Sequence, residues 1–383
     1  MKKNRLELPK GVPRLNTYYV YLTAGCNLAC QHCWISPTYQ KNGGTGGHLD
    51  YDLFVDAINQ GLELGLAAVK LTGGEPLLHP EFCQMVDYLR RKDLSLIIES
   101  NGTLITDSVA HFLKKQGVLT HISISVDGAS AKSHDPFRGV KGSFDKAIQG
   151  IEHMVRAGFR PEIIMSLHPG NADDIEPFVR LAEEIGAGSV KFNLIQPSGR
   201  GENMSSKGQF LDVRKLIEIG TWIREDLQPH SKIRLAYSWP MAFYGIKELI
   251  DYSNYTCSIF SILGILATGH LAMCGIGVEV PELCYGHLSK DTVSSIWIAH
   301  PMLCKLREKI PLQLEGICSR CIFRDHCLGS CIAQNFQLAK RLTAPFWFCQ
   351  EAESLGLFPQ IRLKSKYTNL HIQKEADAHA STI

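Results

Sequence analysis

The sequence predicts an α/β fold: a partial (β/α)6 barrel similar to a TIM barrel, followed by a small C-terminal domain. Short apolar segments rich in β-branched residues alternate with helical periods between residues 17 and 226. Polar residues follow each apolar segment, and cysteines concentrate in the last third of the chain. A doubly wound sheet is the alternative. The barrel is favoured because polar residues at the carboxyl ends of the strands form the active-site rim of such barrels.

The predicted strands are short and apolar, as is typical of parallel strands buried on both faces. They span Tyr18–Thr23, Ala68–Thr72, Ser95–Ser100, His121–Val126, Glu162–Leu167 and Val190–Ile195. The polar residues after them are Thr72 onward, Ser100 and Asn101, Ser125 to Asp127, Ser166 to His168, and Asn193 to Gln196.

Helical periodicity separates these strands. Apolar residues recur at i, i+3, i+4 and i+7 in the segments Phe82–Leu89 and Phe144–Val155, and Leu53–Leu62 and Val213–Gly220 mark the first and last predicted helices. Helix signals accompany them: we expect N-caps at Asp50, Asp107 and Ser143, and helix ends at Gly117 and Gly158.

Composition excludes several classes of protein. The chain has 383 residues, a formal net charge of +2 and 45% hydrophobic residues, so neither a nucleic-acid nor a membrane partner is expected. No segment approaches the ~18 apolar residues that span a bilayer. The basic start, Met1 to Lys10, lacks the apolar core of a signal peptide.

The first chemical motif is Cys26-x3-Cys30-x2-Cys33, directly after the first predicted strand. Three thiolates in one tight loop can ligate three irons of a [4Fe–4S] cluster, which leaves the fourth iron open to a small molecule. Zinc is the alternative for closely spaced cysteines. The odd total of 13 cysteines argues against a closed set of disulfides.

A second motif, Gly73-Gly74-Glu75, follows the second strand. Together with the cysteine loop it resembles the radical S-adenosylmethionine (SAM) superfamily. The resemblance implies that Gly73, Gly74 and Glu75 hold the SAM amino group. It also implies that Ser125 and Arg138 contact the ribose or carboxylate end and that Ile195 backs the adenine. In such enzymes the reduced cluster cleaves SAM to a 5′-deoxyadenosyl radical, which takes a hydrogen atom from the substrate.

The C-terminal cysteines resemble a SPASM domain, the iron–sulfur domain of a group of radical SAM enzymes. The resemblance implies two auxiliary [4Fe–4S] clusters, and so three in all. Cys318, Cys321, Cys327 and Cys349 would ligate one, and Cys257, Cys274 and Cys331 the other. Cys284, Cys304 or the substrate could complete the second, and a zinc knuckle is the alternative.

By this resemblance the chain is a maturase of ribosomally made peptides, similar to the SynChlorMet-cassette group. We expect an oxidative cross-link through carbon, oxygen or sulfur. The alternatives are peptide epimerisation, oxidation of the anaerobic sulfatase-maturase type, and a non-catalytic iron–sulfur or zinc scaffold. Gly275 stands where sulfatase maturases carry an aspartate base, which argues against sulfatase maturation. The candidate bases in this chain are Asp127, Glu99, His168 and His270.

The expected division is an N-terminal extension (1–16), a radical SAM barrel (17–230), a SPASM domain (231–350) and a tail (351–383) whose last part is disordered. Peptide maturases often carry a leader-binding domain of ~80 residues before the barrel, for which residues 1–16 are too short. The expected partners are therefore a precursor peptide or protein, a separate leader-binding protein, and an electron donor of the flavodoxin or ferredoxin type.

Overall fold

The computed structural model describes residues 6–40, 46–251 and 257–364. The chain divides into two compact units. The first comprises the described residues up to Ser238 together with Ser258–Arg307, and the second comprises Trp239–Cys257 and the described residues from Glu308 onward. Among the described residues, no helix is long and apolar enough to cross a membrane.

A ten-stranded sheet forms the first unit, in the order β12-β11-β10-β1-β4-β5-β6-β7-β8-β9. All six predicted strands are present, each within two residues of its expected ends: β1 (Thr17–Thr23), β4 (Ala68–Gly73), β5 (Ser95–Ser100), β6 (Leu119–Ser125), β7 (Glu162–Leu167) and β8 (Ser189–Leu194). They pair in parallel, and β9 (Arg234–Tyr237) continues the parallel run after β8. The predicted α/β class is confirmed.

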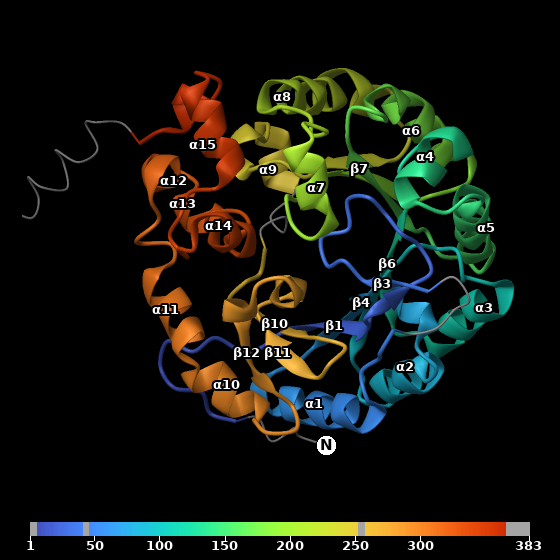
Figure 1. Ribbon diagram of the computed structural model, residues 1–383, viewed down its shortest axis with the longest axis vertical. Coiled ribbons are helices and arrows are strands. Elements are labelled where there is room, and N and C mark those ends of the chain that lie inside the picture. The colour runs from blue at the N-terminus through green and yellow to red at the C-terminus, as the bar shows by residue number, and fades with distance from the viewer. Residues whose placement is uncertain (1–5, 41–45, 252–256, 365–383) are drawn as a thin grey trace, which may run out of the picture. The chain divides into compact units, whose positions relative to one another are not determined.

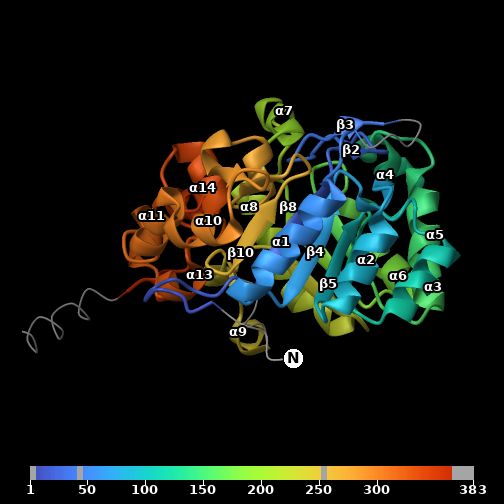
Figure 2. The ribbon, with the colours of Figure 1, turned by 90° about the horizontal axis from the view of Figure 1, so that it is seen from below.

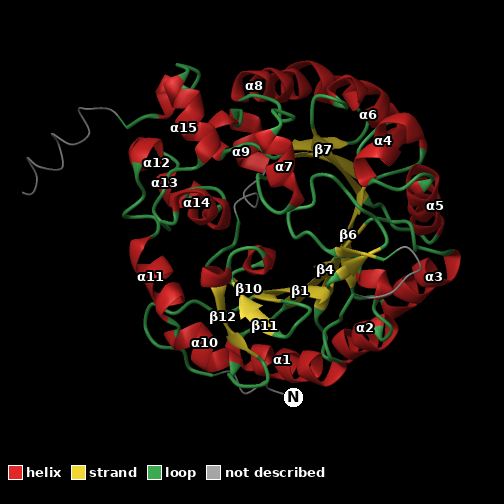
Figure 3. Cartoon of the chain, viewed as in Figure 1, coloured by secondary structure: helices red, strands yellow, loops and turns green. Residues whose placement is uncertain are grey.

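Helices cover the outer side of this curved sheet (Figures 1 and 3). They are α1 (Tyr51–Leu64), α2 (Phe82–Arg91), α3 (Asp107–Gln116), α4 (Ala131–Arg138), α5 (Ser143–Arg156), α6 (Ile175–Glu184) and α8 (Val213–Trp222). Seen from below, α1 and α2 run along the outer face of β10, β4 and β5 (Figure 2).

The helix ends follow side-chain chemistry. Asp50 caps α1 as predicted, since its carboxylate accepts the Leu53 N–H at 3.0 Å. For α3 the N-cap is Thr106 instead of Asp107, because the threonine hydroxyl accepts the Val109 N–H. For α5 the N-cap is Gly142 instead of Ser143, because the Asp135 carboxylate already accepts the first N–H groups of that helix.

Residues 258–307, which the sequence places in the C-terminal domain, pack with the barrel instead. The backbone of β10 (Ile262–Ile265) pairs in parallel with β1, and β11 (His270–Ala272) and β12 (Cys284–His287) extend the sheet in antiparallel. Helix α10 (Val293–Ala299) then returns to the barrel, where the fully buried Trp297 donates to the Pro13 carbonyl at 2.8 Å. The open edge of β1 explains this arrangement, because an unpaired strand edge offers a row of backbone partners.

The second unit is helical. Its elements are α9 (Ile246–Asp251), α12 (Gly316–Arg320), α13 (Arg324–Cys327), α14 (Ile332–Ala339) and α15 (Trp347–Ser354), and α11 (Pro301–Lys309) lies where the two units divide. The ring of Phe243 meets Phe348 and Phe358 edge-on, at 5.2 and 5.8 Å between ring centroids. Residues 351–364 of the predicted tail therefore belong to a packed unit, and its last part, residues 365–383, lies outside the described residues.

Candidate active site

A cavity of about 1090 Å³, including its open mouth, is lined by residues at or just after the carboxyl ends of the parallel strands. It brings together residues that the sequence singled out from distant segments. Those that line it are Cys26, Cys30, Cys33, Gly73, Gly74, Glu99, Ser125, Arg138 and Ile195. This is the strand end at which barrels place their active sites.

The cysteine loop is closed by backbone pairing on both sides. Strand β2 (Gly25–Cys26) pairs in parallel with β3 (Thr38–Tyr39). On the side facing α4, Ala29 N donates to Arg138 O at 3.0 Å and Gln31 N donates to Phe137 O at 2.9 Å. The loop is therefore fixed at its base and along its length, which holds three thiols at one wall of the cavity.

Hydrogen-bond donors point at two of these sulfurs. Leu28 N lies 3.4 Å and Asn101 Nδ2 3.8 Å from Cys26 Sγ, and Arg138 Nη1 lies 3.6 Å from Cys30 Sγ. Burial, followed by the nearby Glu75 carboxylate, raises the pKa of Cys26 to about 12. A bound metal deprotonates such thiols outright. Three sulfur donors, two of them with N–H groups aimed at them, fit a [4Fe–4S] cluster that keeps one iron open.

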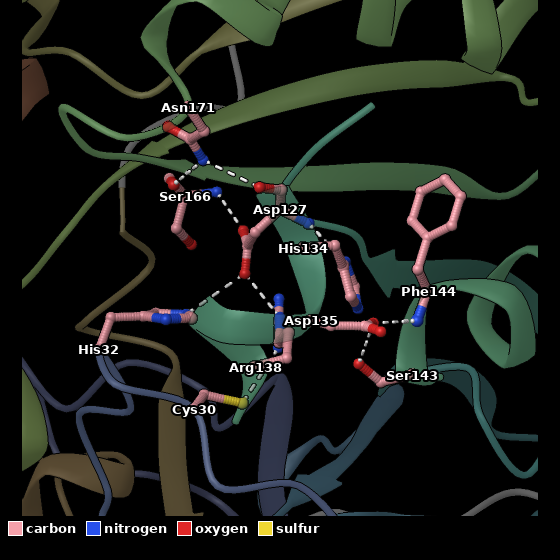
Figure 4. Close-up of polar contacts among 10 residues, drawn as sticks. All are labelled: Cys30, His32, Asp127, His134, Asp135, Arg138, Ser143, Phe144, Ser166 and Asn171. Atoms are coloured by element: carbon pink, nitrogen blue, oxygen red, sulfur yellow. Dashed lines mark hydrogen bonds and ion pairs between the residues drawn. The ribbon is translucent and has the colours of Figure 1, made fainter. Parts of the chain in front are cut away.

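Arg138 is fixed by a fully buried carboxylate (Figure 4). Asp127 Oδ2 lies 2.6 Å from Arg138 Nε, and Asp127 Oδ1 accepts the Ser166 N–H at 2.7 Å. Burial would raise the pKa of Asp127, but the guanidinium outweighs it and holds that pKa below its usual range. Asp127, a predicted candidate base, is thus a paired anion that orients Arg138.

Gly73 and Gly74 are required because the end of β4 passes very close to the backbone at the start of the cysteine loop. A Cβ on Gly74 would lie 1.8 Å from Gly25 O, and one on Gly73, whose φ is +126°, would lie 2.9 Å from Thr23 O. Only residues without a side chain let the end of β4 pass this close to the start of the cysteine loop.

Glu75 is fully buried and does not line the cavity. Its contact with the amino group of SAM stays a prediction. Its carboxylate accepts Ser100 Oγ–H at 2.9 Å and the Asn101 N–H at 2.8 Å. Burial raises the pKa of Glu75 to about 7. In the structure this side chain ties the end of β4 to the end of β5, behind the glycines.

Of the other candidate bases, only Glu99 lines the cavity, and it pairs with Lys70 Nζ at 2.7 Å. Burial alone would raise the pKa of Glu99, but the Lys70 ammonium lowers it. His168 stacks on Phe137 at 4.0 Å between centroids. His270 is exposed, hydrogen bonds to Thr268 Oγ1 at 2.8 Å, and lines a different cavity of the first unit.

The cavity also holds residues that the sequence did not single out. His32 stacks on the face of Phe137, with 4.3 Å between centroids and 4° between planes, and Tyr21 lines the wall. Arg200 begins the short helix α7 (Arg200–Ser206) and also lines it. The Gly199-Arg200-Gly201 run, just after the polar end of the sixth predicted strand, was the available signal for Arg200.

In the second unit, four of the predicted cluster cysteines line one cavity together with Phe323, Phe346 and Phe358: Cys318, Cys321, Cys327 and Cys349. Burial raises the pKa of Cys318 to about 11. Four thiols around one apolar space fit the full ligand set of a [4Fe–4S] cluster. Within the described ranges, no three His, Cys, Asp or Glu side chains are arranged to hold a single metal ion.

The remaining predicted ligands divide between the units. Cys274 belongs to the first unit, whereas Cys257 and Cys331 belong to the second. Cys257 is exposed, and Cys274 and Cys331 are half-buried. Their shared cluster stays a prediction.

Comparison with known sequences places this site in context. Residues 20–182 match the radical SAM superfamily. The AdoMet-dependent heme synthase of Methanosarcina barkeri is 30% identical over 322 residues, covering 80% of this chain and 88% of that protein. The mycofactocin maturase MftC of Mycolicibacterium smegmatis is 28% identical over 368 residues, covering 91% of this chain and 86% of that protein.

Solved structures share the fold. Streptococcus suis SuiB bound to its precursor peptide SuiA matches with a TM-score of 0.69 and 15% identity, covering 88% of this chain and 76% of SuiB. The anSMEcpe structure with bound AdoMet matches with a TM-score of 0.67 and 17% identity, covering 89% of this chain and 96% of that one. At these identities the likeness establishes the fold alone.

Proposed function

Because the chain belongs to the radical SAM superfamily, we propose that it is a peptide maturase. Its reaction would remove a hydrogen atom from a residue of a precursor peptide and form an oxidative cross-link through carbon, oxygen or sulfur. The observation that carries the proposal is the cavity that gathers Cys26, Cys30 and Cys33 with Gly73 and Gly74, in a chain 28% identical to a maturase. When bound there, a reduced [4Fe–4S] cluster and SAM supply a 5′-deoxyadenosyl radical.

The chain's own residues would hold and orient these groups. Cys26, Cys30 and Cys33 ligate the cluster from a loop that is fixed by backbone bonds. The backbone of Gly73 and Gly74 faces the amino group of SAM. Arg138, which pairs with Asp127, would face the carboxylate of SAM, Ser125 would face the ribose or carboxylate end, and Ile195 would lie against the adenine; all three line the cavity.

Two auxiliary clusters complete the proposal. Cys318, Cys321, Cys327 and Cys349 would ligate one, supported by the cavity that they share. Cys257, Cys274 and Cys331 would ligate the other, with Cys284, Cys304 or the substrate as the fourth ligand. The Cys284 thiol donates to Gly277 O at 3.3 Å, and Cys304 is exposed. Three such clusters hold about twelve irons per chain.

The proposed partners are a precursor peptide, a separate protein that binds its leader, and an electron donor of the flavodoxin or ferredoxin type. The proposed location is the cytoplasm, because reduced clusters with an open iron need a reducing environment.

A second candidate substrate class is a porphyrin. The observation that favours it is the identity of 30% to a protein named AdoMet-dependent heme synthase, together with 25% identity to an Fe-coproporphyrin III synthase from the same organism.

Product mass separates these candidates. The reconstituted chain is incubated without oxygen with SAM, dithionite and either a pool of synthetic peptides or iron coproporphyrin III. A cross-linked peptide loses about two hydrogens, an epimerised peptide keeps its mass, and an altered porphyrin favours the second candidate. Peptides that stay unchanged in mass and stereochemistry while the porphyrin reacts would refute the maturase proposal.

A further inference from the structure

The guanidinium of Arg200 lies in the wall of the active-site cavity with unused hydrogen-bonding capacity. Its Nη1 donates to Pro37 O at 3.4 Å. Its Nε and Nη2 are buried and have no hydrogen-bond partner among the described residues. Buried N–H donors without acceptors carry a desolvation cost, which an anionic ligand would relieve.

Among the described residues, the other charged side chains of the wall have ion-pair partners, and Arg200 does not. Arg138 pairs with Asp127 at 2.6 Å, and Glu99 pairs with Lys70 at 2.7 Å. Within the described part of the chain, Arg200 has no ion pair, so one positive charge of the cavity wall is left without a partner.

The position of Arg200 is set by the backbone. Its N–H donates to Cys33 O at 2.9 Å, and Ser198 Oγ donates to Trp34 O at 3.3 Å. A Cβ on Gly199, whose φ is +54°, would lie 2.8 Å from both Cys33 O and Trp34 O. The start of α7 is thus held tightly against the segment that follows the cluster cysteines.

This position adjoins a second cavity of the first unit. Tyr21, Ile35 and Pro37 line both the active-site cavity and a second, more apolar one of about 1070 Å³ including its mouth. Arg200 bonds to Pro37, one of the shared residues. The two cavities therefore share part of a wall beside Arg200.

We propose that Arg200 binds a carboxylate of the substrate. The inference rests on the proposed function, because its ligand is the molecule that this same cavity transforms. The planar fork of an arginine matches a carboxylate with two parallel hydrogen bonds. A peptide offers such a group at its C-terminus or on an acidic side chain, and a porphyrin offers it on its propionates.

The test measures binding instead of turnover. The reconstituted full-length chain, saturated with SAM, is titrated with two pairs of probes. The first pair is a pool of N-acetylated peptides with free carboxylates and the same pool with every carboxyl group amidated, read by ultrafiltration and mass spectrometry. The second pair is iron coproporphyrin III and its tetramethyl ester, read by absorbance.

Three variants accompany the wild type. Arg200→Gln removes the charge, Arg200→Lys keeps it without the fork, and Arg180→Gln changes an exposed arginine on α6 that does not line the cavity. The wild type and Arg180→Gln are expected to bind the acid form of at least one probe pair about tenfold to a hundredfold more tightly than the neutral form. We expect Arg200→Gln to abolish that preference and Arg200→Lys to keep only part of it. None of the three variants is expected to change the Kd for SAM by more than about twofold.

The outcomes separate the two proposals. Acid preference confined to the porphyrin pair and lost in Arg200→Gln supports the carboxylate site and refutes the peptide maturase. Absence of acid preference in both pairs overturns the carboxylate site, as does an Arg200→Gln variant that weakens SAM binding and keeps the preference. Iron content and thermal melting check each fold, and if Arg200→Gln fails to fold, the partial loss in Arg200→Lys decides.

Discussion

At the scale of single residues, the site depends on charges that are buried in pairs. Asp127 is fully buried and Arg138 nearly so, and their ion pair is joined by a contact from Arg138 to the Cys30 sulfur (Figure 4). The sequence singled out both residues, Arg138 as a contact of SAM and Asp127 as a candidate base, but it did not predict that Asp127 pairs with Arg138. Such a pairing depends on the distance between two loops, which the sequence does not contain.

The first prediction concerns this pair. Asp127→Asn leaves the Arg138 guanidinium buried without its counter-charge, so the free energy of unfolding is expected to fall by about 3–5 kcal/mol. Anaerobic urea unfolding of the metal-free chain, followed by tryptophan fluorescence, measures it. The control Asp87→Asn, which removes an exposed pair with Arg90, should cost less than about 1 kcal/mol. Equal losses in both variants would contradict the buried-pair interpretation.

At the scale of elements, the predictable part of the fold was the part with a strong local signal. The parallel strands β1 and β4–β8 follow from short β-branched runs, and the Asp50 cap follows from its place before an apolar period. The strands β9–β12 were missed because they are three or four residues long and take their stability from neighbouring strands. Arg200 was missed because its place in the cavity wall is set by a contact with the cysteine segment, which is distant in the sequence.

The end of β4 gives a second prediction. Gly74→Ala places a methyl group where Gly25 O lies 1.8 Å away, so the cysteine loop must shift. We expect SAM cleavage to fall at least about a hundredfold, since a 1 Å displacement at a reacting centre has that effect. Gly117→Ala is the matched control: its φ of +70° is strained but no atom lies within 4 Å, so only stability should fall, by about 1 kcal/mol. Similar 5′-deoxyadenosine yields from the two variants would show that the close contact between Gly74 and Gly25 is not needed for SAM cleavage.

The α4–α5 junction gives a third prediction. The Asp135 carboxylate accepts Gly142 N–H at 2.6 Å and Phe144 N–H at 2.8 Å. Burial would raise the pKa of Asp135, but these hydrogen bonds lower it. Asp135→Ala should therefore cost about 0.5–2 kcal/mol at neutral pH.

The pH dependence of that cost has a definite sign. Because the folded state depresses the pKa of Asp135, its stabilisation is present above the unfolded pKa of ~3.9 and is lost as the pH falls through the folded value. The stability difference between wild type and Asp135→Ala, from urea unfolding, should be constant near neutrality and shrink in acid. A difference that grows in acid would contradict the capping role.

At the scale of the whole molecule, the cysteines are distributed over two compact units. Where one loop or one helical unit supplies a predicted group of cysteines, the group lines one cavity: Cys26, Cys30 and Cys33 line the first, and Cys318, Cys321, Cys327 and Cys349 line the second. The predicted domain boundary differs from the observed division, because backbone pairing with β1 draws residues 258–307 to the barrel.

Iron content gives a prediction at this scale. Changing Cys321 and Cys349 together to Ser should remove one cluster, or about four irons per chain, from the second unit. Changing Cys83 to Ser, an exposed cysteine on α2 outside both cavities, should leave the iron content unchanged. An unchanged iron count after the double substitution, or zinc in place of iron in the wild type, would contradict the assignment.

The most direct test of the central claim is dithionite-driven release of 5′-deoxyadenosine by the anaerobically reconstituted chain. If the cavity of the first unit is a radical SAM site, the wild type and Cys83→Ser release it from SAM. The variant with Cys26, Cys30 and Cys33 changed to Ala releases none and holds about four fewer irons. A fully iron-loaded wild type that releases no 5′-deoxyadenosine, or equal release from the triple variant, would contradict the account.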